Sequence, residues 1–421
     1  MTDISIIGLG YVGLPLAHAF SKKYRVTGYD INSLRIDELK SGYDRTKELT
    51  QEQINESLKS GIIFTCDTDD IKNSNIYIIT VPTPIDSDNK PDLTPILDST
   101  RTVANILKKN DIVIYESTVY PGVTEEVCVP ILEEFSKLKF NETFFCGYSP
   151  ERINPGDREH TLENIVKITS GSDVNTAKKV DELYASIIGA GTYLAPSIKI
   201  AEAAKVIENT QRDVNIALMN ELAMIFDLMS IDTREVLKAA ATKWNFINFS
   251  PGLVGGHCIG IDPYYLTHKA QALGYMPNLI LGARQINNSM SKLIVSKTIK
   301  SMIKEDKKLK DSNVLIMGVT FKENCPDMRN SRSLDIIKEL QEYGCHVEVY
   351  DQWVDKSDKK SKNLNFIEEF PHNCKKYDAV VIAVGHEGFK DITTKEYESI
   401  SNGKPIVIDV KGVAKEATWR L

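Results

Sequence analysis

A cysteine in a glycine-rich segment is the side chain of this sequence best placed for covalent chemistry. Cys258 lies in Pro251-Gly-Leu-Val-Gly-Gly-His-Cys-Ile-Gly-Ile-Asp-Pro-Tyr-Tyr-Leu266, which contains four glycines and two prolines. Glycine pairs let a backbone come close to a ligand, and a proline restricts the path of the chain that leaves the loop. An isolated cysteine is usually a small buried hydrophobe. Cys258 is a candidate nucleophile only if other segments supply its partners.

A glycine motif near the beginning of the sequence predicts a dinucleotide site. An apolar run at residues 4–7 precedes Gly8-Leu-Gly10-Tyr-Val-Gly13, and a helical pattern follows to residue 20. In this strand, turn and helix order, the first glycine makes the turn and the second admits the pyrophosphate. The third glycine lets the helix pack closely on the strand.

An acid follows the motif at the expected distance. A second predicted strand, residues 24–30, ends in Asp30, which would bind the ribose hydroxyls. Its charge would repel a 2′-phosphate, so NAD is favoured over NADP. Arg35 lies nearby in sequence and is either a nucleotide contact or a solvated helix charge.

Three further apolar runs, at residues 75–81, 111–115 and 143–147, end in small polar segments. Such β-branched runs, separated by helical segments, predict a parallel sheet covered on both faces. Ligands bind beyond the carboxyl ends of parallel strands. Thr83, Thr118 and Glu151 are therefore expected around one crevice, although each alone would more often be a cap or turn residue.

A long helix is predicted in the middle of the chain. No glycine or proline interrupts residues 198–229, and this length exceeds the ~11–12 residues of an average helix. Such a helix usually crosses a domain or subunit boundary, and we expect it to be the spine of a homodimer. Lys205 and Asn209 are four residues apart and share one face. The alternative for Lys205 is an exposed lysine paired with Glu202 or Glu208.

The pattern of the first half recurs after residue 310. Strands are predicted at residues 313–318, 346–351, 378–384 and 405–409, with a helix at 333–343. Gly318-Val-Thr-Phe-Lys322 replaces the dinucleotide motif, so this half suits a nucleotide phosphate but not a second dinucleotide. The prediction is an α/β protein with two Rossmann-like, doubly wound parallel-sheet domains, residues 1–195 and 301–421. A helical middle domain, residues 196–300, joins them, and two nucleotides would meet at a central cleft.

Composition excludes several classes of function. The chain has 421 residues, 42% hydrophobic and 26% charged, and a formal net charge of −7, which argues against nucleic-acid and anionic-membrane partners. No signal peptide and no apolar run of ~20 residues is evident. The seven cysteines form no Cys-x-x-Cys pair, so neither a disulfide framework nor a metal site is expected. We expect a cytoplasmic protein with reduced thiols.

From residue 4 to about residue 412 these motifs, in this order, resemble the UDP-glucose/GDP-mannose dehydrogenase family. The Gly-Gly-His-Cys sequence and the downstream Gly-Ile-Asp-Pro-Tyr-Tyr-Leu-Thr-His-Lys-Ala are similar to the branch acting on UDP-N-acetylhexosamines, whereas UDP-glucose enzymes typically carry Gly-Gly-Ser-Cys. The resemblance implies an NAD-dependent, four-electron oxidation of the sugar C6 alcohol to a carboxylate. The product would feed a capsule, O-antigen or related polysaccharide in a bacterium or archaeon.

The resemblance also implies roles for the candidate residues. Cys258 would attack the intermediate aldehyde, and the resulting thiohemiacetal would be oxidised to a thioester. Lys205 would stabilise negative charge on the C6 oxygen. Asn209 and Asp262 would orient that oxygen and a water. Thr118 and Glu151 would position the hydrolytic water. NAD contacts are expected from Gly8, Gly10, Tyr11, Val12, Gly13, Asp30, Arg35, Thr83, Thr118 and Arg329. Substrate contacts are expected from Glu151, Arg152, Lys205, Asn209, Gly255, His257 and Lys322.

Several alternatives stay open. A two-electron β-hydroxyacid dehydrogenase would share the Rossmann start and the Lys/Asn pair but would not need Cys258, and a non-catalytic nucleotide-sugar sensor would need none of the polar set. A UDP-glucose dehydrogenase differs only in the cysteine segment. UDP-N-acetylglucosamine is favoured over its galacto and manno epimers. Family members often place an arginine upstream of the cysteine, where this sequence has only Lys243, and Arg and Lys bind oxygen groups differently.

Overall fold

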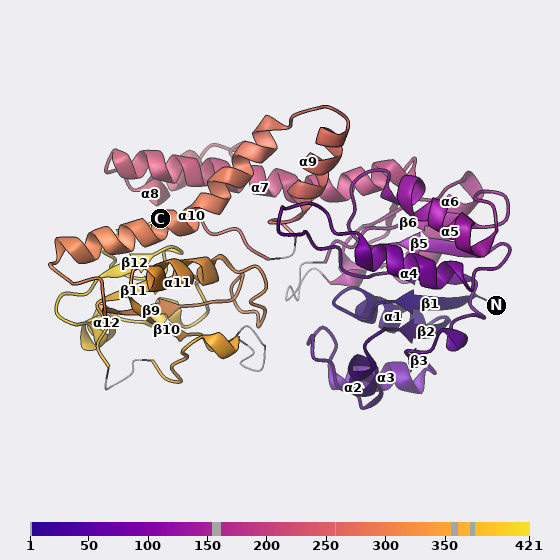
Figure 1. Cartoon of the computed structure of the whole chain (residues 1–421), viewed down its shortest axis with the longest axis horizontal. Helices are drawn as coiled ribbons and strands as arrows, with labels where there is room; N and C mark the ends of the chain where they lie inside the picture. The colour runs from indigo at the N-terminus through magenta and orange to yellow at the C-terminus, as the bar shows by residue number, and fades with distance from the viewer. Residues whose placement is uncertain (1, 154–160, 257, 355–360, 371–374) are drawn as a thin grey trace. The chain divides into compact units, whose positions relative to one another are not determined.

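The structure, a computed structural model, describes residues 2–153, 161–256, 258–354, 361–370 and 375–421 (Figure 1). By its internal contacts the chain forms two compact units. Unit 1 comprises Met1–Glu208 and Tyr264–Tyr275, and unit 2 comprises Asn209–Pro263 and Met276–Leu421. The three-domain division inferred from the sequence stays a prediction.

Unit 1 is built on a six-stranded parallel sheet in the order β3-β2-β1-β4-β5-β6. This strand order is that of a dinucleotide-binding Rossmann sheet, whose ligand crevice lies where the order reverses, here between β1 and β4. Its elements are β1 (Asp3–Ile7), α1 (Gly13–Ser21), β2 (Arg25–Tyr29), α2 (Ser33–Lys40), α3 (Gln51–Lys59), β3 (Ile63–Thr65), η1 (Thr68–Asp70), β4 (Ile76–Ile79), α4 (Thr94–Ala104), β5 (Ile112–Tyr115), the π-helical η2 (Val123–Cys128), α5 (Val129–Ser136), β6 (Phe145–Tyr148), η3 (Leu162–Asn164), β7 (Lys167–Thr169), α6 (Val174–Ala185) and β8 (Thr192–Leu194).

The unit 1 sheet is covered on both faces, as its apolar runs predicted. Alternate residues of each strand point to opposite faces. Ile6 and Ile114 belong to a core with α1, α3 and α6. Their strand neighbours Ile7 and Tyr115 belong to a second core, with α4, α5 and the beginning of α7 (Ile198–Leu228).

Unit 2 repeats the plan with five parallel strands in the order β10-β9-β11-β12-β13. Val314 and Ile316 lie in a core with α10 and α11, whereas Leu315 and Met317 pack with α12 on the other face. The elements after α7 are α8 (Thr233–Ala240), α9 (Asp262–Ala272), α10 (Asn278–Lys304), β9 (Asn313–Met317), α11 (Arg332–Glu342), β10 (His346–Tyr350), η4 (Ser361–Asn363), β11 (Ala379–Ile382), η5 (Phe389–Asp391), α12 (Thr394–Ile400), β12 (Val407–Asp409) and β13 (Trp419–Arg420).

The predicted fold class is confirmed, and each predicted strand ends within two residues of the observed one. The predicted helix at 198–229 is the 31-residue α7. The sequence did not reveal β3, β7, β8 and β13, because strands of two or three residues rarely show a period; β12 is as short, but the apolar run before it made it predictable. None of the helices in the described ranges is long and apolar enough to cross a bilayer.

The beginning of α7 is anchored in unit 1 by a buried carboxylate. Glu202 is fully buried and accepts hydrogen bonds from the amides of Gly122, at 2.5 Å, and Thr124, at 3.0 Å, where η2 begins. Glu202 and Glu208 were the suggested partners of Lys205. Glu202 instead binds these amides, and Glu208 pairs with Arg152 at 2.7 Å. Burial raises the pKa of Glu202 to about 7, although the two amide hydrogen bonds oppose this rise.

The raised pKa of Glu202 predicts a pH-dependent stability. A carboxyl group whose pKa is raised on folding stabilises the fold below its unfolded value of about 4.5 and loses that contribution as pH rises to about 7. Between pH 4.5 and 8 the loss should be about 2–3 kcal/mol. Glu202→Gln should remove this part of the pH dependence in urea unfolding titrations. Glu221→Gln, at an exposed position of the same helix, is the matched control and should keep the wild-type slope.

Candidate functional site

The glycine turn of unit 1 is held by the end of β2. Gly8 has a φ of 96°, which favours glycine, and its amide donates to the carbonyl of Tyr29 at 2.8 Å. The next amide, that of Leu9, donates to Asp30 Oδ2 at 2.9 Å, while Asp30 Oδ1 accepts from the amide of Asn32 at 2.9 Å. The Asp30 carboxylate is thereby fixed at the carboxyl end of β2, with lone pairs left over for hydroxyl donors.

The turn fits a dinucleotide pyrophosphate. A Cβ on Gly10 would meet nothing within 4 Å, whereas a Cβ on Gly13 would lie 1.8 Å from the carbonyl oxygen of Gly8. Tyr11 and Val12 complete the turn, and among the described residues no side chain caps the helix at Val12. The first amides of α1 are therefore available to an anion. The structure is thus consistent with the predicted roles of Gly10 and Gly13.

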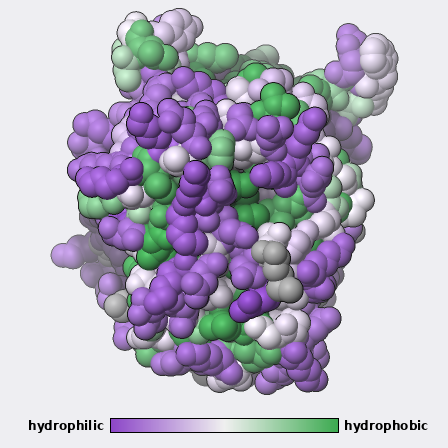
Figure 2. All heavy atoms as spheres, turned by 90° about the vertical axis from the view of Figure 1, so that its right-hand side faces the viewer, coloured by the Kyte–Doolittle hydropathy of each residue, from purple (hydrophilic) through white to green (hydrophobic). Residues whose placement is uncertain are grey.

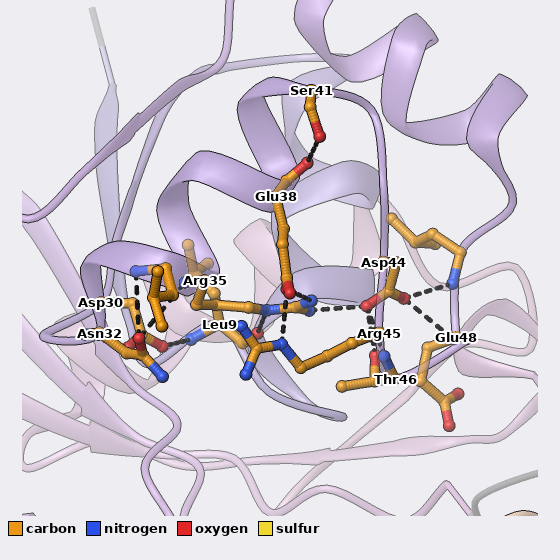
Figure 3. Close-up of polar contacts among 12 residues, drawn as sticks. Leu9, Asp30, Asn32, Arg35, Glu38, Ser41, Asp44, Arg45, Thr46 and Glu48 are labelled. Atoms are coloured by element: carbon orange, nitrogen blue, oxygen red, sulfur yellow. Dashed lines mark hydrogen bonds and ion pairs between the residues drawn. The ribbon is translucent and has the colours of Figure 1, made fainter. Parts of the chain in front are cut away.

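Arg35 is not a solvated helix charge, so that alternative was wrong. It is only 4% exposed, its Nε donates to the carbonyl of Leu9 at 2.9 Å, and its Nη2 lies 2.7 Å from Asp44 Oδ1 (Figure 3). Burial opposes ionisation of Asp44, but hydrogen bonds from Thr46 and Leu49 and the charge of Arg35 hold its pKa below the ordinary value. Arg35 thus stabilises the glycine turn through its hydrogen bond to the carbonyl of Leu9.

Polar residues follow three neighbouring strands of unit 1. Thr83 comes after β4 and Thr118 after β5, and both are partly buried. Ser117 Oγ donates to the carbonyl of Val81 at 2.6 Å, and the Tyr148 hydroxyl donates to the carbonyl of Ser117 at 3.2 Å. These hydrogen bonds tie together the segments that leave β4, β5 and β6.

Glu151 lies just beyond β6 in a network that the sequence did not reveal. Its Oε1 accepts from the amides of Arg152 and Ile153, both at 2.6 Å, and its Oε2 lies 3.0 Å from Lys167 Nζ. Lys167 also contacts Glu116 Oε2, at 2.9 Å. A charged residue inside the apolar run 165–169 and an acid directly after the buried β5 were the available indications.

Two other candidates of unit 1 are associated with α7: Arg152 pairs with a residue of this helix, and Lys205 lies in it. The Arg152 guanidinium pairs with Glu208 at 2.7 Å and donates to the carbonyl of Val166 at 2.7 Å. Lys205 is buried, at 7% exposure, in the first third of α7. Asn209 follows one turn later, so the two side chains leave the helix on the same face.

In unit 2 the cysteine is placed by a turn and a buried hydrogen bond. The Cys258 carbonyl accepts from the amides of Ile261, at 3.1 Å, and Asp262, at 2.9 Å. Asp262 Oδ2 in turn accepts from Asn209 Nδ2 at 2.6 Å, and both side chains are buried. Cys258 is partly buried and Cys66 is exposed, whereas Cys128, Cys146, Cys325 and Cys345 are buried.

The glycines before Cys258 allow the segment to lie directly on a loop of unit 2. A Cβ on Gly255 would be 2.6 Å from the carbonyl oxygen of Asn330, and one on Gly256 would be 2.7 Å from the Phe321 ring. Gly256 also exchanges hydrogen bonds with Asn330, through its amide at 3.4 Å and its carbonyl at 3.3 Å. These close approaches explain why the segment is rich in glycine.

The same loop carries two predicted binding residues. Gly255 and Lys322 line a small pocket at the N-terminus of α11 together with Arg332, Ser333 and Lys411. Glu323 also lines the pocket and pairs with Lys411 at 2.6 Å, so two further cationic side chains and the helix N-terminus make the pocket suited to an anion. Arg329, also on the loop, forms a bidentate ion pair with Asp327, with Nη2 at 2.7 Å from Oδ2. His257 lies outside the described residues.

Unit 2 has an aspartate, Asp351, at the position that corresponds to Asp30 of unit 1, but this aspartate is buried. The amide of Val319 donates to Asp351 Oδ2 at 2.8 Å, as that of Leu9 does to Asp30. Asp351 is only 3% exposed, however, and its Oδ2 also lies 3.0 Å from His386 Nε2. The amide of Asn324 donates to His386 Nδ1 at 3.0 Å, so Nε2 carries the proton and donates it. Asp351, which corresponds in position to Asp30, is thus bonded to side chains and amides of unit 2 and is not exposed to a ribose.

No metal centre emerges from the geometry. Within the described residues, no group of three or more His, Cys, Asp and Glu is placed to hold a metal ion.

The two motif glycines should fail in different ways when changed to alanine. Gly10→Ala meets open space in the protein alone, so its stability should be unchanged, but its methyl would occupy the pyrophosphate position and weaken NADH binding about 10²-fold or more. Gly13→Ala should destabilise the fold by about 3 kcal/mol or more, because its methyl overlaps a backbone oxygen. Fluorescence titration with NADH and urea unfolding would measure the two effects. Wild-type NADH affinity in Gly10→Ala would contradict the assignment.

Comparison with protein families matches most of the chain. Residues 2–188 match the NAD binding domain of the UDP-glucose/GDP-mannose dehydrogenase family, residues 199–289 its central domain, and residues 315–416 its UDP binding domain. The three matches follow one another in the order that the sequence motifs predicted.

Individual relatives cover the whole length. The chain is 53% identical over 420 residues to a UDP-N-acetyl-D-glucosamine 6-dehydrogenase of Salmonella typhi, covering 99% of this chain and 98% of the relative. It is 52% identical over 414 residues to an enzyme of the same name from Pseudomonas aeruginosa, covering 98% and 97%. A UDP-D-ManNAc dehydrogenase structure from Pyrococcus horikoshii is similar with a TM-score of 0.89 and 31% identity, covering 100% and 98%. The chain belongs to the UDP-glucose/GDP-mannose dehydrogenase family and is an NAD-dependent oxidoreductase.

Proposed function

We propose that the protein oxidises the C6 alcohol of UDP-N-acetylglucosamine to the carboxylate, by way of a thioester on Cys258. The observation that carries this proposal is the partly exposed position of Cys258, in a glycine-rich segment held by the buried Asn209–Asp262 hydrogen bond. A two-electron dehydrogenase or a nucleotide-sugar sensor has no need of such a thiol. The identities of 53% and 52% to enzymes named for this sugar favour it over UDP-D-ManNAc, for which the identity is 31%.

The overall reaction consumes one water and releases two hydrides in succession from C6, which NAD accepts. In the first oxidation, Lys205 stabilises the negative charge that develops on the C6 oxygen. The Cys258 thiolate then attacks the aldehyde carbon, forming a C–S bond, and Asn209 and Asp262 orient the oxygen. The thiohemiacetal loses the second hydride and becomes a thioester.

Hydrolysis of the thioester makes the sequence irreversible. A water positioned by Thr118 and Glu151 attacks the carbonyl carbon, the C–S bond breaks, and the sulfur leaves as the thiolate. The UDP group would be held in unit 2, where Lys322, Arg332 and Lys411 line the anion-suited pocket. We further propose that the protein acts in the cytoplasm and that its product supplies a surface polysaccharide.

The stoichiometry of NADH tests the mechanism and the substrate together. Purified protein should form two NADH per UDP-N-acetylglucosamine, with little from UDP-glucose or UDP-N-acetylmannosamine. Cys258→Ala should lower multiple turnover to the carboxylate by about 10³-fold or more, because the thioester cannot form. Cys345→Ala, at a buried cysteine directly before β10, is the control and should keep the wild-type stoichiometry. One NADH per sugar, or carboxylate formed repeatedly without Cys258, would exclude the thioester route.

A homodimer along α7 is part of the proposal. Four exposed apolar residues of α7 are seven, eleven and seven residues apart, which places them on one stripe of a 3.6-residue helix: Ile200, Ile207, Leu218 and Ile225. By contrast, the face drawn in Figure 2 is mostly hydrophilic, with apolar atoms in separated patches. Exposed apolar side chains that share one face of a helix are typical of association surfaces.

Leu218→Glu should convert the dimer to a monomer. Burying an unpaired carboxylate at the centre of the stripe costs several kcal/mol, so association should weaken by at least about 10²-fold. Size-exclusion chromatography with light scattering would give the mass over a range of concentrations. Lys338→Glu, at an exposed position of α11, is the control and should remain dimeric. A wild-type protein that is monomeric at all concentrations would overturn the proposed dimer.

A further inference from the structure

Unit 1 contains a cluster of ionisable side chains around Glu151, and Glu151 is the one member of the cluster that the reaction steps above use. Lys167 Nζ, on β7, lies between Glu116 Oε2, at 2.9 Å, and Glu151 Oε2, at 3.0 Å. The hydroxyl of Tyr184, on α6, donates to Glu116 Oε1, and Lys167 Nζ lies 5.4 Å from the centre of the Tyr184 ring. Three strand ends and a helix thus contribute to one cluster.

The cluster is almost closed to water and carries more acid than base. The side chains of Lys167 and Glu116 are 3% and 0% exposed, and that of Glu151 is 11% exposed. Burial raises the pKa of Glu116 to about 7, with Lys167 opposing and Glu151 reinforcing the rise. Burial disfavours the ammonium of Lys167, but the two carboxylates more than compensate and raise its pKa. Lys167 therefore stays charged, and with both carboxylates ionised the cluster has one excess negative charge.

Glu151 is the member of the cluster nearest to solvent. Its Oε1 is held by two amides of its own turn and its Oε2 by Lys167, so the orientation of the carboxylate is fixed from both sides. Oε1 accepts two hydrogen bonds, which occupy both of its lone pairs, whereas Oε2 accepts one and has a second lone pair. A water can therefore be bound at Glu151 without breaking these contacts.

We propose that Lys167, with Glu116 as its counter-ion, is a positioning residue that orients Glu151 as the proton acceptor in thioester hydrolysis. This inference rests on the proposed function. The water oxygen forms a bond to the thioester carbon, the C–S bond breaks, Cys258 leaves as the thiolate, and the water proton passes to Glu151. Proton transfer removes the excess negative charge, because one ammonium then faces one carboxylate. The buried negative charge of Glu116 thus favours proton transfer to Glu151, and Lys167 keeps the Glu151 carboxylate in its orientation.

The charge balance predicts a pH dependence for hydrolysis. The titratable groups that face Glu116 are Lys167, Glu151 and Tyr184. Because the pKa of Glu116 is about 7, its charge is lost as pH falls below 7, and hydrolysis should slow there. Glu116→Gln should remove this limb of the profile and slow hydrolysis at pH 8 by about 10-fold, while Lys167 still holds Glu151.

The decisive experiment separates oxidation from hydrolysis. Each full-length variant is mixed rapidly with NAD and UDP-N-acetylglucosamine, the NADH burst is followed, and acid-quenched protein is weighed by mass spectrometry. Lys167→Met should keep a burst of two NADH per active site, then turn over about 10- to 100-fold more slowly than wild type and accumulate a sugar adduct on Cys258. Glu151→Gln should behave likewise and more severely. Lys179→Met, at an exposed position of α6, should match wild type.

The outcomes distinguish the inference from the function on which it rests. A wild-type protein that yields one NADH per sugar, or a Glu151→Gln variant without an adduct, counts against the proposed function itself. If those two behave as expected but Lys167→Met turns over within twofold of wild type without an adduct, Lys167 has no positioning role. A burst reduced in proportion to turnover would show general damage and also overturn the inference. If Lys167→Met does not fold, the pH profile of hydrolysis in Glu116→Gln is the test. An acidic limb like that of the wild type in this variant would overturn the inference.

Discussion

One hydrogen bond at the first crossover of each sheet organises both halves of the protein. The amide after the first glycine donates to an aspartate at the end of the next strand, through Leu9 and Asp30 in unit 1 and Val319 and Asp351 in unit 2. The bond satisfies a backbone donor that the tight turn would otherwise leave unpaired. It also fixes where the turn lies relative to the sheet. In unit 1 this turn is the predicted binding position of the pyrophosphate.

The two copies of this device differ in what surrounds the carboxylate. In unit 1 the acid remains partly exposed and Arg35 supports the turn from behind, through the carbonyl of Leu9. In unit 2 His386 covers the acid and binds the amide of Asn324, in the loop that carries Lys322. A solvent-facing carboxylate can accept ribose hydroxyls, whereas a buried one serves only the loop. Two sheets of similar strand order therefore support a dinucleotide site in unit 1 and, in unit 2, the loop that we propose to bind phosphate.

Buried polar groups also hold the cysteine segment to the helices of unit 2. Asn220 Nδ2 donates to the carbonyl of Gly252 at 3.0 Å, and the Gly252 amide donates to Asn220 Oδ1 at 2.8 Å. Asn220 is linked further to Asn287, which with Arg284 binds the buried Asp213. A buried polar network is stable only when its members are satisfied together, and such networks specify one arrangement of the elements. The start of a glycine-rich segment is thus fixed by α7 and α10.

The sequence by itself determined the local features of this protein. Most strands of the two large sheets, the long helix, the Gly8–Gly13 turn and the Cys258 segment were predictable, because each depends on a hydrophobic pattern or on a backbone conformation that only certain residues adopt. The family followed from the order of these motifs. The roles of Thr118, Glu151, Lys205 and the other candidate residues remain proposals.

Only the tertiary structure decided which charged side chains are buried and with whom. Lys167 meets Glu116 across 51 residues and Glu151 across 16, and His386 meets Asp351 across 35. Neither composition nor periodicity specifies such pairs, because side-chain partners far apart in sequence are chosen by the packing of strands and helices. For the same reason Arg35 could be taken for a solvated charge, although the fold buries it against Asp44. Burial, which sets the charge state of Glu116, exists only once the sheet has formed its two covered faces.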